Sequence, residues 1–152
     1  MSLFIRLFMP GVLLSLCVIT HALVMTGLLR RLSRPAGIEA LRFWATTWAL
    51  IRVALWILTA HMSEIAIWAA FYWRQRIFPD FSTSFYFSAV TYTTVGYGDL
   101  VLPETWRLFA AVEGLTGILM CGWSTGVFFA VVSAMYAGRQ AEARAAEKAG
   151  RP

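Results

Sequence analysis

The sequence has few charged residues and almost no cysteine. Of its 152 residues, 14% are charged and 59% are hydrophobic. A soluble domain of this size cannot bury so many apolar side chains, so the composition predicts an integral membrane protein without a second large domain. The two cysteines, Cys17 and Cys121, both lie in apolar runs. This placement argues against a disulfide framework or a cysteine metal site and predicts two buried thiols.

The sequence also lacks an internal repeat, a low-complexity core, a nucleotide-binding motif and a recognisable catalytic constellation. We therefore expect neither enzyme activity nor an organic cofactor. The formal net charge is +5. The basic residues gather beside the apolar runs, so this surplus is expected to orient the chain in a membrane rather than to bind nucleic acid.

Three apolar segments are long enough to cross a bilayer, for which about 20 residues suffice. They cover residues 7–29, 43–73 and 106–136. As helices, the last two would be roughly 46 Å long at about 1.5 Å per residue. This length exceeds the ~30 Å hydrocarbon core and predicts tilt or extension into water. No small-x-small cleavage site precedes the arginines after the first segment, so we expect a retained helix rather than a signal peptide.

A shorter apolar segment lies between the second and third spans. Residues 74–80 form a polar turn with a proline, and Ser82 is the predicted N-cap of a helix over residues 84–93. This helix is too short to span the membrane and is therefore predicted to be re-entrant. Irregular backbone after it is tolerated at membrane depth only where it is buried in protein or lines a water-filled path.

The loop charges predict the orientation. Basic residues lie after the first span and after the third, and both regions are expected on the cytoplasmic side: Arg30, Arg31, Arg34 and Arg42 in the first, and Arg139, Arg144, Lys148 and Arg151 in the second. Three spans then place the N-terminus and the 74–103 loop outside and the C-terminus in the cytoplasm.

Residues 93–99 read Thr-Thr-Val-Gly-Tyr-Gly-Asp. Gly96 and Gly98 tolerate backbone dihedrals that residues with a β-carbon avoid, so successive carbonyls can face the same way. Val95 and Tyr97 would then point away and pack behind the loop, and the Thr94 hydroxyl could add one more oxygen. A row of such oxygens can replace the hydration shell of K⁺.

Residues 43–136 resemble the pore module of potassium channels, most closely the small bacterial ion-channel proteins with one pore loop per subunit. The resemblance implies an all-α membrane protein with three transmembrane helices, a re-entrant pore helix and a filter loop. One loop per chain implies a homotetramer that conducts K⁺ passively across the inner membrane. The expected regions are an additional helix with a basic linker, the pore domain and a short cytoplasmic tail, at residues 1–42, 43–136 and 137–152.

The resemblance also assigns roles to individual residues. The ion-binding filter comprises Thr94, Val95, Gly96, Tyr97 and Gly98, and K⁺ there is the only metal expected. Support of the filter and its outer mouth falls to Thr93, Asp99, Tyr86 and Glu113. The cavity and gate are expected at Gly117, Ile118, Cys121, Thr125 and Phe129.

The sequence departs from the family pattern in its gating elements. Val90 stands where some relatives have a glutamate that pairs with the acidic residue at Asp99, so gating through that pair is not expected. No helix carries an arginine at every third position, which argues against direct voltage sensing. The tail is too short for a nucleotide- or Ca²⁺-sensing domain.

Several polar residues inside the spans have two interpretations. His61 and Glu64 lie one turn apart on one helix face, and Glu113 lies one turn before Gly117. These groups either form a proton-sensitive brace on the pore helix or are packing polars satisfied by hydroxyls such as those of Thr91 or Thr116. His21 is expected to be structural. Gly117 is either a hinge or a packing position, and Gly122 and Gly126 are expected to allow close helix approach.

Other functions remain open beside the selective channel. A poorly selective cation channel would use the same scaffold, although the intact motif argues against it. A non-conducting sensor or accessory subunit could also retain the pore architecture. An intramembrane enzyme built on His61 and Glu64 is disfavoured because the sequence shows no metal or nucleophile beside them.

Overall fold

The computed structural model describes residues 3–32, 43–148 and 150, and this part of the chain is helical apart from turns and loops. Its elements are α1 (Leu3–Leu32), α2 (Phe43–Arg74), α3 (Phe81–Tyr92), a single 3-10 turn η2 (Glu104–Trp106) and α4 (Arg107–Lys148). Arg34, Arg42 and Arg151, which support the predicted orientation, lie outside the described residues.

Three of the helices are long and apolar enough to cross a membrane. The candidate spans are Phe8–Arg31, Thr46–Arg74 and Glu104–Ala145. They match the three predicted spans, and α4 continues past residue 136 to Lys148, so most of the short tail is part of this helix. The chain is therefore an all-α membrane protein.

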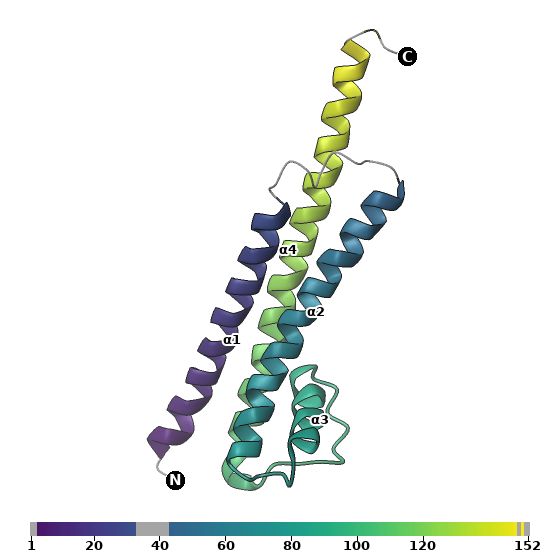
Figure 1. Cartoon of the computed structure of the whole chain (residues 1–152). Coiled ribbons are helices and arrows are strands. Elements are labelled where there is room, and N and C mark those ends of the chain that lie inside the picture. Colours follow the sequence, from purple (N-terminus) through teal and green to yellow (C-terminus); the bar gives the residue numbers. More distant parts are fainter. Residues whose placement is uncertain (1–2, 33–42, 149, 151–152) are drawn as a thin grey trace.

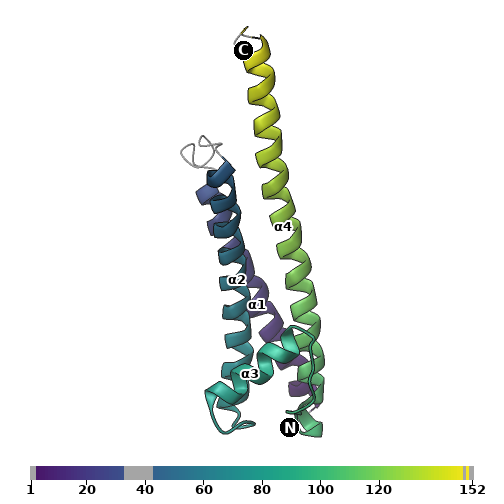
Figure 2. The ribbon, with the colours of Figure 1, turned by 90° about the vertical axis from the view of Figure 1, so that its right-hand side faces the viewer.

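Helices α1, α2 and α4 run alongside one another, and the short helix α3 lies at one end of this bundle (Figure 1). The N-terminal end of α1 lies at the same end as α3, whereas the C-terminal part of α4 projects beyond the opposite end. Viewed after a quarter turn, α3 crosses the end of the bundle from α2 towards α4 (Figure 2). Helix α3 packs against both of these helices.

Two groups of buried apolar side chains hold the bundle together. The larger group surrounds α3 and includes Trp68, Tyr72, Phe87 and Phe109. The smaller group joins α1, α2 and α4 at the other end. Many large apolar side chains nevertheless remain exposed on the outer faces of the single chain. Exposed surface of this kind suits contact with lipid or with further protein.

Two predictions about individual residues are wrong. The N-cap of α3 is Asp80, not Ser82, because the Asp80 carboxylate accepts hydrogen bonds from the Thr83 amide at 2.8 Å and from the Thr83 hydroxyl at 3.0 Å. Of the two thiols, Cys17 is buried as predicted, but Cys121 is exposed. Cys121 lies on a face of α4 that no other described part of the chain covers.

Candidate functional site

Helix α3 is fixed at both ends by local hydrogen bonds. At its start, the amide and hydroxyl of Thr83 bind the Asp80 carboxylate and lower its pKa. At its end, the amide of Thr93 donates to the carbonyl of Ala89 at 3.1 Å, and the Thr93 hydroxyl donates to the same oxygen at 2.7 Å. The chain leaves the helix at this capped end and enters the 93–99 loop.

The loop has positive φ at every second residue. The values are 62° at Thr94, 57° at Gly96 and 78° at Gly98. The glycines adopt this conformation without steric cost, as predicted, but a β-branched threonine rarely does. Thr94 is held there by its own amide, which donates to the Thr91 carbonyl at 3.0 Å. Strained residues of this kind often occur at functional sites.

The helix end also anchors the middle of the loop. The amides of Val95 and Gly96 both donate to the Val90 carbonyl, at 3.0 and 3.2 Å. The side chains of Val95 and Tyr97 are 52% and 72% exposed within the single chain. Their predicted packing behind the loop therefore requires a surface that this chain alone does not supply.

The C-terminal end of the 93–99 loop is tied to α3 by one side-chain hydrogen bond. The Tyr86 hydroxyl donates to Asp99 Oδ2 at 2.8 Å. This bond raises the pKa of the Tyr86 phenol. The sequence has Val90 at the position where a glutamate was considered as a partner of Asp99. In the structure Tyr86, one helical turn earlier on α3, bonds to Asp99 instead.

Glu113 of α4 connects its own helix to α2 and α3. Its side chain is fully buried, and it accepts a hydrogen bond from the Tyr72 hydroxyl of α2 at 2.8 Å and another from the Ser88 hydroxyl of α3. Ser88 Oγ also lies 3.0 Å from the carbonyl oxygen of Ile65. Hydroxyl partners were predicted for Glu113, but Thr116 is not one of them, because its hydroxyl donates to the Val112 carbonyl.

A second buried polar cluster lies between the helices. His61 and Glu64 share a face of α2 as predicted, and His21 of α1 and Ser124 of α4 complete the cluster together with Tyr92 at the end of α3. His21 Nδ1 lies 2.7 Å from Glu64 Oε1, and His61 Nδ1 lies 3.0 Å from the Tyr92 hydroxyl. The Tyr92 hydroxyl also donates to Glu64.

Ser124 closes this cluster into a ring. Its Oγ lies 3.2 Å from His21 Nε2 and 3.1 Å from His61 Nε2. Each of the five side chains thus has hydrogen-bond contacts with two others, and the ring joins all four α-helices. The sequence pattern indicated only the His61–Glu64 pair, since partners on other helices leave no local periodicity.

The predicted gate residues lie along one exposed face of α4. Ile118 is 61% exposed and Phe129 is 71% exposed, and Cys121 and Thr125 are exposed as well. Gly117 differs from them because it is buried against the end of α3. This part of α4 therefore has Gly117 turned to α3 and an uncovered face that includes the other four residues.

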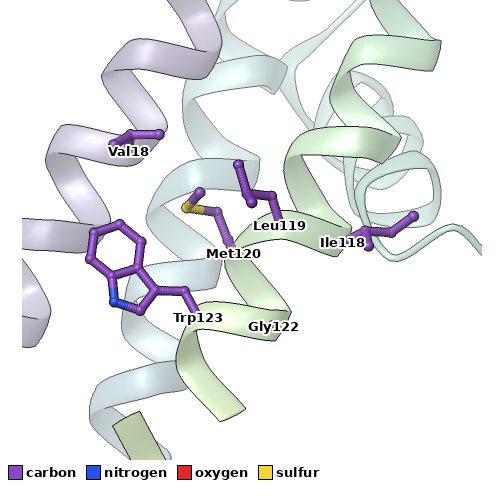
Figure 3. A pocket seen from close by; sticks show the side chains of 6 residues that line it. All are labelled: Val18, Ile118, Leu119, Met120, Gly122 and Trp123. Carbon is purple, nitrogen blue, oxygen red and sulfur yellow. The ribbon is translucent and has the colours of Figure 1, made fainter. Parts of the chain in front are cut away.

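An open apolar groove of about 610 Å³ lies between α1 and α4 (Figure 3). Val18 lines it from α1, and the remaining lining residues come from α4: Ile118, Leu119, Met120, Gly122 and Trp123. Apart from the Trp123 indole nitrogen, the side chains that line it carry no polar atom, so the groove suits apolar contact rather than recognition of a polar ligand.

Comparison with known proteins agrees with this architecture. Three helices able to span a membrane and a short helix that leads into an irregular loop define an ion-channel type of membrane protein. A family model described as ion channel matches residues 57–134, about half of the chain, and the chain belongs to this family. The match includes part of α2, all of α3, the loop and most of α4, but not α1. No curated protein and no solved structure matches the chain.

Proposed function

We propose that the chain is a K⁺-selective channel subunit and that residues 94–98 form its selectivity filter. The observation that carries this proposal is the positive φ at Thr94, Gly96 and Gly98. A backbone conformation that alternates in this way turns successive carbonyl groups to one side of the loop. Carbonyl oxygens arranged around an axis replace the hydration shell of K⁺, and several adjacent sites allow rapid passage.

The ring of carbonyls would require four chains, because each chain supplies one loop. The exposure of Tyr97 and Val95 supports a homotetramer, in which neighbouring subunits would cover these side chains. The exposed α4 face of Ile118, Cys121 and Phe129 would then line the central cavity. The C-terminal end of α3, with its partial negative charge, would favour a cation there.

The proposed orientation places the N-terminus and the filter loop outside and the C-terminus in the cytoplasm of a cell bounded by an inner membrane. The N-terminal end of α1 and the loop share one end of the bundle, and the C-terminal part of α4 projects from the other, so the two ends lie on opposite sides. The basic residues Arg30, Arg31, Arg139 and Arg144 belong to the side opposite the loop and support its assignment as cytoplasmic. K⁺ and membrane lipid are the expected partners, with no further cofactor in conduction.

The proposal is tested with purified protein in liposomes. We expect K⁺ flux that greatly exceeds Na⁺ flux and that Ba²⁺ blocks, together with a tetrameric mass by native mass spectrometry. Absence of K⁺ flux at every pH and voltage would favour the non-conducting subunit. Equal Na⁺ flux would favour the poorly selective channel.

Two glycine variants separate backbone geometry from packing. An added Cβ meets no atom within 4 Å at either Gly96 or Gly138, but only Gly96 has a positive φ. Gly96→Ala is therefore expected to lose selective K⁺ flux through its backbone alone. Gly138→Ala, in the helical extension of α4, should retain flux at the level of the unmodified protein.

A further inference from the structure

A polar ring is formed by His21, Glu64, Tyr92, His61 and Ser124. The proposed conduction of K⁺ gives its two histidines and its glutamate no role. The chain contains only two histidines, and both are in this ring although they are 40 positions apart. The side chains of His21 and Glu64 are fully buried, and that of His61 is 14% exposed. Ionisable groups are costly inside a membrane, so a cluster of three indicates a function.

The three ionisable side chains are close enough to hold one metal ion. Each offers one ligand atom, and these atoms lie within 4.8 Å of one another. The separation is 2.7 Å between His21 Nδ1 and Glu64 Oε1, and 3.6 Å between His61 Nδ1 and Glu64 Oε2. Ligand atoms around a tetrahedral zinc ion are about 3.4 Å apart at ordinary zinc–ligand distances. Small side-chain adjustments bring the three atoms to this spacing.

The surrounding hydrogen bonds suit ligation through both Nδ1 atoms. If these atoms bind a metal, both Nε2 atoms carry a proton and need acceptors. Ser124 Oγ lies within hydrogen-bond distance of both and has two lone pairs. The Tyr92 hydroxyl, which donates to Glu64, holds the carboxylate. Outer partners of this kind fix the tautomer and orientation of metal-binding side chains.

The proton count of the ring also leaves room for a cation. Its five contacts each need one proton. With Glu64 ionised, the ring is completed either by an additional proton on one imidazole or by a metal ion bound between His21, His61 and Glu64. A metal ion there replaces the hydrogen bonds of the two Nδ1 atoms, so the ring needs fewer protons.

We propose that His21, His61 and Glu64 bind one Zn²⁺ ion per subunit. Two imidazole nitrogens and one carboxylate oxygen form a donor set that zinc favours, with a fourth position left for water. The site is distinct from the proposed filter, whose donors are all oxygen atoms. It does not depend on K⁺ selectivity.

Zinc at this position joins the additional helix to the ion-channel module. His21 belongs to α1, which lies outside the family match at residues 57–134. Tyr92 immediately precedes the 93–99 loop. The ion therefore fixes α1 against α2 and acts on the end of α3, so that zinc occupancy changes ion flux through the loop.

The experiment uses the full chain, purified in detergent with a tag that contains no histidine and then depleted of metal. Titration with Co²⁺ is followed by its visible absorption, and Zn²⁺ is then added in competition. We expect one Co²⁺ per subunit, a spectrum typical of four or five ligands, displacement by Zn²⁺, and a rise in unfolding temperature with Zn²⁺ concentration. Absence of Co²⁺ absorption and of any thermal shift overturns the proposal. The side chains of the ring would then be joined by hydrogen bonds alone, without a metal ion.

Variants test the ligands directly. His21→Asn and His61→Asn are expected to abolish the Co²⁺ spectrum, whereas Glu104→Gln, which changes an exposed carboxylate, should retain it. Ser124→Ala keeps all three ligands and remains informative if the histidine variants fail to fold. It should weaken binding about 10- to 100-fold, as expected for loss of an outer partner, and unchanged affinity overturns the proposed arrangement.

X-ray absorption at the zinc edge identifies the ligand atoms. The expected shell contains two imidazoles and oxygen, without sulfur. Cys17 lies one helical turn before His21 and is buried, so it is the nearest competing ligand on α1. A sulfur signal would overturn the assignment. These readouts need no ion flux, so they distinguish failure of the zinc proposal from failure of the K⁺ channel proposal.

Discussion

Gly117 of α4 lies directly against the carbonyl group of Tyr92 at the end of α3. A Cβ atom on Gly117 would come within 1.8 Å of the Tyr92 oxygen and 2.8 Å of its carbonyl carbon. No side chain larger than hydrogen fits there without a backbone shift. This close approach gives the packing interpretation of Gly117 a physical reason. Helix α4 runs as one helix from Arg107 to Lys148, and a hinge at Gly117 stays a prediction.

Gly117→Ala is expected to destabilise the protein because it forces α4 away from the end of α3. Overpacking of this kind costs about 1–3 kcal/mol. The measurement is denaturant or thermal unfolding of the purified protein, together with K⁺ flux, which should fall because the displaced Tyr92 leads into the loop.

Gly114→Ala is the matched control. The added Cβ would lie 3.5 Å from the Thr91 oxygen, which is ordinary contact. Alanine also has the better helix propensity, by roughly 0.5–1 kcal/mol. This variant should therefore be as stable as the unmodified protein or more so. Equal stability of the two alanine variants would contradict the close contact at Gly117.

Glu113→Gln should weaken the connection between α2, α3 and α4. The substitution replaces one of the two carboxylate oxygens with an amide that donates, so the Ser88 hydroxyl can no longer donate to residue 113 and is left with the Ile65 carbonyl as its acceptor. Loss of one such hydrogen bond costs about 0.5–1.5 kcal/mol. Unfolding measurements on Glu113→Gln, Tyr72→Phe and the double variant test this, and the double variant should lose less than the sum of the two.

The same variant separates the two interpretations of Glu113. A packing role predicts lower stability with an unchanged dependence of K⁺ flux on pH. A proton-sensitive brace predicts that the pH dependence flattens in Glu113→Gln. Additive effects of Glu113→Gln and Tyr72→Phe on unfolding would contradict the hydrogen bond itself.

The sequence predicted the helices well because their signals are local. Runs of apolar residues predicted the three spans, and the polar turn with its proline predicted where α3 begins. The N-cap was misplaced because Asp80 and Ser82 are both good caps, and only the observed bond to Thr83 selects between them. The glycines predicted positive φ at two loop positions, whereas Thr94 adopts it against its own preference.

The remaining features depend on contacts between distant segments. The partners of Glu113 come from α2 and α3, and the residues of the polar ring come from all four α-helices. The periodicity of one helix does not predict which hydroxyl group of another helix will lie next to it. The exposure of Cys121 likewise depends on which α4 face the other helices cover.

Tyr86→Phe is expected to loosen the C-terminal end of the 93–99 loop, because it removes the hydrogen bond to Asp99. K⁺ flux should then decline several-fold faster after channel opening, as measured in a time-resolved flux assay. Ser15→Ala, which removes an exposed hydroxyl of α1 that bonds only to its own helix, serves as the control. Identical decay in the two variants would remove Tyr86 as a support of the loop.

The Tyr86 bond should also respond to alkaline pH. The hydrogen bond to Asp99 raises the pKa of Tyr86 above the ordinary value of 10.0. Its contribution is therefore complete below pH 10 and is lost as pH rises through the raised pKa. The unmodified protein should behave like Tyr86→Phe only in that alkaline range.

Asp80 is expected to make the start of α3 sensitive to acid. The backbone hydrogen bond from Thr83, and then that from its hydroxyl, lower the pKa of Asp80 below the ordinary value of 3.8. The cap therefore stabilises the helix at every pH above 3.8 and is lost as pH falls through the lowered pKa. Asp80→Asn keeps a capping oxygen but cannot titrate, whereas Asp80→Ala removes the cap. Unfolding temperatures measured between pH 7 and pH 2 should show Asp80→Ala below the other two at neutral pH. The unmodified protein should fall relative to Asp80→Asn only below pH 4, and parallel curves for these two proteins would exclude Asp80 as the acid-sensitive cap.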